Sequence, residues 1–114
     1  MTANEYSIGY RPEAIEDVRI ILANYKMLSG VQSSNRMLTK LRTAIDQLSE
    51  LPYIGMIYPD PELSGLELRR LVVEKYLIFY RVFEMEKHIE IYRVINGTTN
   101  FIQMLKNFFD DEEL

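Results

Sequence analysis

The chain has 114 residues, no cysteine, one histidine and a formal net charge of −4. This length suits a single domain, residues 1–114, and the absence of cysteine excludes disulfides, thiol catalysis and zinc–thiolate sites. No apolar run is long enough to span a membrane and no signal peptide opens the chain, so we expect a cytoplasmic protein.

The first strand and the first helix are predicted over residues 5–10 and 11–29. Tyr6, Ile8 and Tyr10 share one face of the strand, but Gly9 weakens it, so we expect this strand at a sheet edge. Pro12 suits the first turn of the helix, because its missing N–H would have no partner there. Apolar residues then recur every three or four positions until Gly30, a residue typical of helix ends.

A second helix is predicted from Ser33 or Ser34, either of which can cap it, to Pro52, which stops it. Its apolar residues repeat the same helical spacing. Two long helices joined by a short loop pack antiparallel, so we expect a helical hairpin. Residues 52–64 contain three of the four prolines, which predicts an irregular loop after the hairpin.

Three consecutive strands are predicted over residues 66–73, 76–83 and 89–95. The turns between them are so short that the strands must be antiparallel neighbours. In the middle strand neither set of alternate side chains is polar, so both faces of the sheet should be covered. We expect the hairpin on one face and, on the other, a short helix of this chain or a second polypeptide. This second face is where we look for function.

A last short helix is predicted after Asn96-Gly97, with apolar residues at 101, 102, 105, 108 and 109. Residues 110–114 form an acidic tail that accounts for the whole negative excess, which leaves a neutral body. A neutral body disfavours nucleic-acid binding through phosphates alone. The predicted fold is therefore α+β in the order β-α-α-β-β-β-α, an antiparallel sheet backed by a helical hairpin, with a short C-terminal helix.

The order and spacing of these segments resemble the RelE/ParE family of toxins, and the long helical hairpin is closer to the ParE-like branch. The resemblance covers roughly residues 5 to 105. It is carried by Pro12-Glu13-Ala14 with Asp17, Leu51-Pro52 with Gly55, Leu68-Arg69, the run YLIFYR from Tyr76 to Arg81 and the run IYRVING from Ile91 to Gly97.

The resemblance implies the toxin of a bacterial type II toxin–antitoxin system, which inhibits growth until a cognate antitoxin neutralises it. ParE-like members inhibit DNA gyrase, whereas RelE-like members cleave mRNA on the ribosome with basic side chains and a tyrosine. Three functions follow: a gyrase-binding toxin, which is our leading hypothesis; a ribosome-dependent mRNA endoribonuclease without metal; or an inactive member that binds antitoxin or stabilises a plasmid. No cofactor and no metal is expected, and the sequence does not decide whether the chain forms a homodimer.

Candidate site residues come from the predicted strands and the segment after them. Under the ribonuclease hypothesis, Arg70, Arg81 and Arg93 would hold the phosphate and stabilise the charged phosphorane. We expect the only histidine, His88, to be a solvated residue of a turn. The predicted partner-binding or base-stacking residues are Arg69, Tyr76, Tyr80, Tyr92, Asn96, Thr99 and Phe101.

The basic pattern of the family is incomplete in this chain. Family members commonly read His-Gly-x-Arg-Asp after the last strand, whereas this chain has Asn96 and Thr99 at the histidine and arginine positions. Arginines beside glutamates on strands usually form cross-strand ion pairs instead of binding phosphate. Alternation also predicts that Arg93 shares its face with Ile89, Ile91 and Ile95. A lone cation among apolar groups needs a partner.

Overall fold

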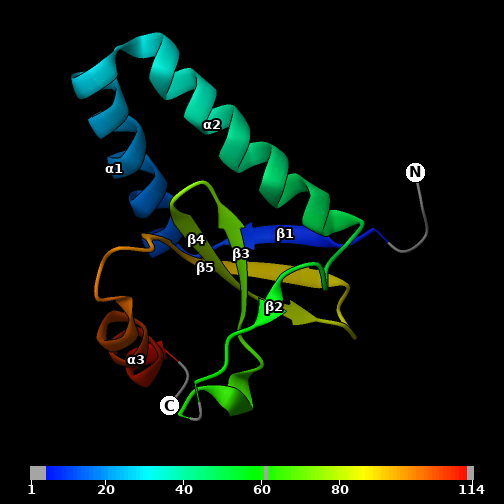
Figure 1. Cartoon of the computed structure of the whole chain (residues 1–114). Helices are drawn as coiled ribbons and strands as arrows, with labels where there is room; N and C mark the ends of the chain where they lie inside the picture. The colour runs from blue at the N-terminus through cyan, green and yellow to red at the C-terminus, as the bar shows by residue number, and fades with distance from the viewer. Residues whose placement is uncertain (1–4, 61, 113–114) are drawn as a thin grey trace.

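A computed structural model describes residues 5–60 and 62–112. The helical hairpin covers one side of a five-stranded sheet, and the C-terminal helix lies on the other side (Figure 1). The predicted α+β class is confirmed. The helices are α1 (Pro12–Ser29), α2 (Val31–Asp46) and α3 (Phe101–Glu112); the strands are β1 (Ser7–Tyr10), β2 (Met56–Ile57), β3 (Arg69–Val73), β4 (Tyr76–Phe83) and β5 (His88–Asn96).

The strand order in the sheet is β1-β5-β4-β3-β2, and β3, β4 and β5 form the predicted antiparallel meander. The sheet as a whole is mixed, because β1 runs parallel to β5. Hairpin and meander separate these two strands along the chain, so no local sequence signal marks their pairing. A second difference is β2, two residues within the predicted loop, which pair with Arg69 and Arg70.

The helical hairpin has a tighter joint than the sequence predicted. Gly30 has a φ of 93°, a conformation that glycine adopts without strain, and α2 starts at the next residue. Ser33 and Ser34 therefore lie inside α2 and do not cap it. The Ser34 hydroxyl instead donates a hydrogen bond to the Leu22 carbonyl across the hairpin, at 3.0 Å. None of the described helices is both long enough and apolar enough to cross a membrane.

The core on the hairpin side of the sheet joins alternate residues of β4 to the apolar stripes of α1 and α2. Tyr76, Ile78 and Tyr80 of β4 pack there, as their predicted alternation requires. Their helical partners include Ala14, Ile21, Met37, Leu41 and Ile45.

The core on the other side is formed by α3 and the segment that leads into β3. Phe79, Tyr92 and Ile95 of the sheet are each less than 5% exposed beneath the apolar residues of α3. Of the two coverings expected for this face, a short helix of this chain or a second polypeptide, the structure shows the first at its centre, because the chain's own last helix buries it. This helix continues through Asp110 to Glu112, so the predicted acidic tail is helical that far; residues 113 and 114 lie outside the described residues.

An irregularity in the β4–β5 pairing changes which way the end of β5 faces. Phe79 pairs with Arg93 and Tyr80 with Ile91, so Tyr92 is the extra residue of a β-bulge. The bulge shifts the alternation of side chains along β5. Ile91, before the bulge, packs on the hairpin side, whereas Ile95, after the bulge, packs on the α3 side. The prediction that Arg93 shares one face with Ile89, Ile91 and Ile95 is therefore right for Ile95 and wrong for Ile89 and Ile91.

Candidate functional site

The three arginines predicted for phosphate chemistry lie on one face of the sheet, the face that α3 covers. Arg70 on β3 and Arg93 on β5 both pair with Phe79, the residue at the centre of this face. Arg81 follows Phe79 by two positions on β4 and so points the same way. We call these three side chains the arginine face.

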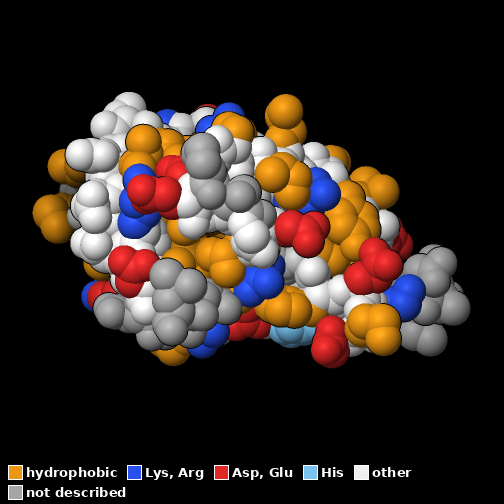
Figure 2. Space-filling model, turned by 90° about the horizontal axis from the view of Figure 1, so that it is seen from below, with side chains coloured by type: hydrophobic (Ala, Val, Ile, Leu, Met, Phe, Trp, Pro, Cys, Tyr) orange, Lys and Arg blue, Asp and Glu red, His pale blue; other side chains and the backbone are white. Residues whose placement is uncertain are grey.

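Each side chain of the arginine face is engaged by the protein itself. The Arg81 Nε donates a hydrogen bond to the Leu66 carbonyl at 2.7 Å, and the Arg70 guanidinium lies 5.8 Å from the centre of the Tyr58 ring. Arg93 is bound by a carboxylate. Figure 2 views the molecule from the α3 side and shows basic side chains interspersed with acidic and apolar ones, without a continuous basic patch. Such a surface attracts a polyanion weakly.

The partner of Arg93 is Asp17 of α1. Arg93 Nε and Nη2 donate to the two carboxylate oxygens of Asp17 at 2.7 and 2.9 Å. Asp17 also accepts a hydrogen bond from the backbone N–H of Val94 at 2.9 Å. These bonds raise the pKa of Arg93, although its partial burial acts in the opposite direction. The expected partner of the lone cation is thus a residue of α1, and the guanidinium is committed to it.

The predicted tyrosines lie in the two cores. Tyr80 is fully buried on the hairpin side, where its hydroxyl donates to the Pro52 carbonyl at 2.8 Å and accepts from the Gly55 N–H at 2.9 Å. Burial raises the pKa of Tyr80. Tyr92 is buried under α3, with its ring against Phe108 and Phe109. In this arrangement neither ring presents a face on which a base could stack.

Tyr76 is also buried, at the start of β4. Burial, and then a hydrogen bond with Tyr25 of α1, raise the pKa of Tyr76 to about 12. Its phenol therefore stays protonated at any physiological pH.

Two other predicted binding residues pack against the body of the protein. Arg69 Nη1 donates to the Gly55 carbonyl at 2.6 Å, and its guanidinium lies 4.8 Å from the centre of the Tyr53 ring. Phe101, the first residue of α3, has its ring centre 5.7 Å from that of Phe79.

Four of the predicted site residues meet in one hollow of about 250 Å³ between α1, the end of β5 and the start of α3. They are Tyr76, Arg93, Asn96 and Thr99. The Asn96 side chain accepts hydrogen bonds from the N–H and the hydroxyl of Thr98, which fixes the turn after β5. The hollow thus combines the Asp17–Arg93 pair with apolar walls, and its polar groups serve largely to hold the turn and the helix in place.

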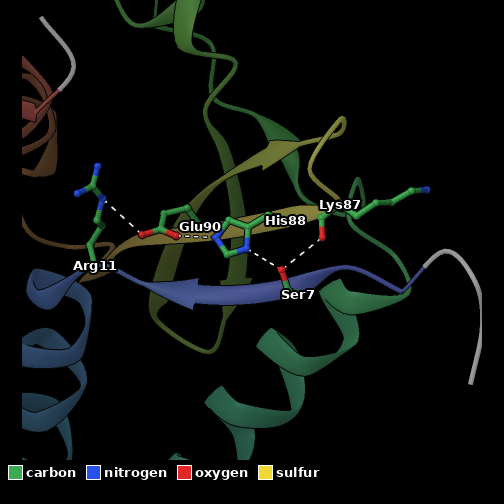
Figure 3. Close-up of polar contacts among 5 residues, drawn as sticks. All are labelled: Ser7, Arg11, Lys87, His88 and Glu90. Atoms are coloured by element: carbon green, nitrogen blue, oxygen red, sulfur yellow. Dashed lines mark hydrogen bonds and ion pairs between the residues drawn. The ribbon is translucent and has the colours of Figure 1, made fainter.

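A second polar cluster, which the sequence did not predict, crosses β1 and β5 (Figure 3). His88 Nδ1 lies 2.8 Å from the Ser7 hydroxyl oxygen, and His88 Nε2 lies 2.8 Å from Glu90 Oε1. The other carboxylate oxygen of Glu90 is 3.5 Å from Arg11 Nε. We call Ser7, Arg11, His88 and Glu90 the histidine cluster.

The prediction of a solvated turn histidine is wrong. His88 is the first residue of β5, is partly buried, and stacks on the Phe83 ring. An imidazole held between a hydroxyl and a carboxylate can accept or release a proton in a fixed orientation. Sequence reasoning missed the cluster because the parallel register of β1 and β5, which aligns Ser7 with His88, has no local signal.

No group of three or more histidine and acidic side chains that could hold a metal ion occurs among residues 5–60 and 62–112.

The fold matches those of solved toxin–antitoxin assemblies. The chain is similar to a chain of the structure described as the chromosomal ParDE TA system from P. aeruginosa, with a TM-score of 0.68, 19% identity, and coverage of 82% of this chain and 98% of that one. It is also similar to a chain of the toxin–antitoxin complex RelBE2 from Mycobacterium tuberculosis, with a TM-score of 0.60, 20% identity, and coverage of 81% and 98%. A comparison with curated proteins gives no match.

The chain thus shares its fold with a chain of each of these two assemblies. Residues 8–101 match the family model described as the ParE toxin of the type II toxin–antitoxin system parDE. The chain belongs to the ParE toxin family.

Proposed function

We propose that this protein is a cytoplasmic toxin that acts by binding DNA gyrase and is neutralised by a cognate antitoxin. The observation that carries the proposal is the state of the arginine face, where Arg93 is held by Asp17, Arg81 by a backbone carbonyl, and Arg70 lies over an aromatic ring. Cations already committed to the protein are poor groups for stabilising a phosphorane. Family membership supports the toxin class, and the resemblance to the ParE-like branch supports gyrase as the target.

The test is a DNA supercoiling assay with purified gyrase and purified toxin. We expect the toxin to inhibit supercoiling, and the polypeptide encoded in the adjacent reading frame to restore it when added in equimolar amount. Inducing the toxin in cells should arrest growth, and co-expression of that polypeptide should reverse the arrest. Unchanged supercoiling at a large molar excess of folded toxin would refute gyrase as the target.

A second candidate function, a ribosome-dependent mRNA endoribonuclease, is favoured by the histidine cluster. His88 lies on the same side of the sheet as Arg81, because Arg81 pairs with Glu90 and Phe83 with His88. Cleavage by the RNA 2′-hydroxyl needs a base for its proton and an acid for the leaving oxygen, roles that an oriented imidazole can fill.

The two functions are separated by incubating the toxin with a translating extract and mapping mRNA ends. The ribonuclease hypothesis predicts discrete cuts that disappear with His88→Ala or Arg81→Ala. The control is Arg19→Ala, which removes an exposed arginine of α1 that pairs only with its neighbour Glu16 among the described contacts. If neither supercoiling nor mRNA changes and induction is harmless, the third hypothesis, an inactive antitoxin-binding member, holds instead.

A further inference from the structure

The strand β1 leaves one edge of the sheet open. Its odd-numbered residues bond to β5: the N–H of Ser7 donates to the Lys87 carbonyl and that of Arg11 to the Ile91 carbonyl, both at 2.9 Å. By the alternation of a β-ladder, the N–H and C=O groups of Ile8 and Tyr10 point away from β5. No described residue, in the ranges 5–60 and 62–112, pairs with them. Two donors and two acceptors are therefore available for an added strand.

The hairpin side of this open edge carries an apolar hollow. The hollow has a volume of about 220 Å³ and lies between β1 and the two long helices. At its mouth Tyr10 is 40% exposed and Ile15 is 57% exposed, both large for apolar side chains. Its lining residues are Tyr10, Ile15, Val18, Leu38, Leu41, Arg42 and Ile45.

The other side of the same edge is polar. Ser7 points to this side as part of the histidine cluster, and a Cβ added at Gly9 would lie 2.8 Å from Glu90 Oε1 on the same side. A strand laid beside β1 would therefore place alternate side chains against an apolar hollow and against a polar surface. The added strand should therefore have a sequence in which apolar and polar residues alternate.

We propose that this edge takes up an extended segment of a partner polypeptide, with apolar side chains at alternate positions and a carboxylate that meets Arg42. The inference rests on the proposed function, in which that partner is the antitoxin. Arg42 lines the hollow, so charge complementarity favours a carboxylate on the side chain that enters it.

The test uses the whole toxin and the full polypeptide encoded in the adjacent reading frame. It measures the dissociation constant of their complex and the hydrogen exchange of the toxin's backbone amides. We expect exchange at Ile8 and Tyr10 to slow on binding. Tyr10→Pro removes one outward N–H without removing a bond to β5, and should bind about tenfold or more weakly than Tyr10→Ala, which keeps that N–H.

A second pair of variants leaves the β1 backbone untouched. Ile15→Glu puts a carboxylate at the mouth of the hollow and should weaken binding, whereas Val31→Glu, 55% exposed at the far tip of the hairpin, should bind as the wild type does. If the polypeptide binds and all four variants bind alike, the edge is not the docking site and the inference is overturned while the toxin–antitoxin proposal stands. If the polypeptide does not bind the wild type, both fail.

Discussion

The carboxylate of Asp17 joins α1 to the end of β5 by accepting two hydrogen bonds from Arg93 and one from the Val94 N–H. At this point β1 has already ended, so Asp17 supplies the acceptor that a neighbouring strand would otherwise provide for Val94. The pair is thus a structural link between the hairpin and the sheet.

Removing Asp17 should destabilise the fold. Asp17→Ala leaves a mostly buried guanidinium and a backbone N–H without their acceptor, and we expect a loss of about 2–4 kcal/mol in the free energy of unfolding. Urea denaturation followed by circular dichroism measures it. The matched control is Glu16→Ala, whose ion pair with Arg19 is exposed and whose unfolding midpoint should not move. An equal response of the two variants would contradict the role given to Asp17.

The Tyr80 hydroxyl should be required for the loop between α2 and β2. Tyr80→Phe leaves the Gly55 N–H and the Pro52 carbonyl without their partner inside the protein, at a cost of about 1–3 kcal/mol in the free energy of unfolding. Tyr53→Phe, at a tyrosine 46% exposed, is the control and should have little effect. Gly55→Ala should also destabilise the protein, because its Cβ would lie 2.6 Å from the Tyr80 hydroxyl oxygen.

The helix α3 should be an integral part of the core. Leu105 is fully buried in the cluster that covers Phe79 and Tyr92, so Leu105→Ala should cost about 2–5 kcal/mol in the free energy of unfolding. Ile102, on the same helix but 44% exposed, provides the control Ile102→Ala. Chemical denaturation of the two variants tests this prediction. If Leu105→Ala were as stable as the wild type, the packing of α3 on the sheet would not contribute to the stability of the fold.

High pH should destabilise the protein through Tyr76. Its pKa is raised from 10.0 to about 12 in the folded state, so the folded protein holds this proton more tightly than the unfolded chain. The resulting stability is fully present below pH 10 and is lost as the pH rises towards 12, with a slope of up to about 1.4 kcal/mol per pH unit. Tyr76→Phe should flatten this loss between pH 10 and 12 in urea titrations. An unchanged slope in that variant would assign the loss to other groups.

The sequence by itself determined the helical hairpin, the three-stranded meander and the C-terminal helix, because each is encoded by a local period of apolar residues and by a turn residue such as Gly30 or Pro52. It also indicated the family. The tertiary structure alone decided that β1 pairs in parallel with β5, that a bulge at Tyr92 redirects Arg93 towards Asp17, and that α3 closes the second face. Each depends on contacts between residues far apart in the chain, and pairing of that kind leaves no periodicity in a single sequence. For the same reason Ser7, Arg11 and Glu90 became part of a site around His88 only once the strands were set side by side.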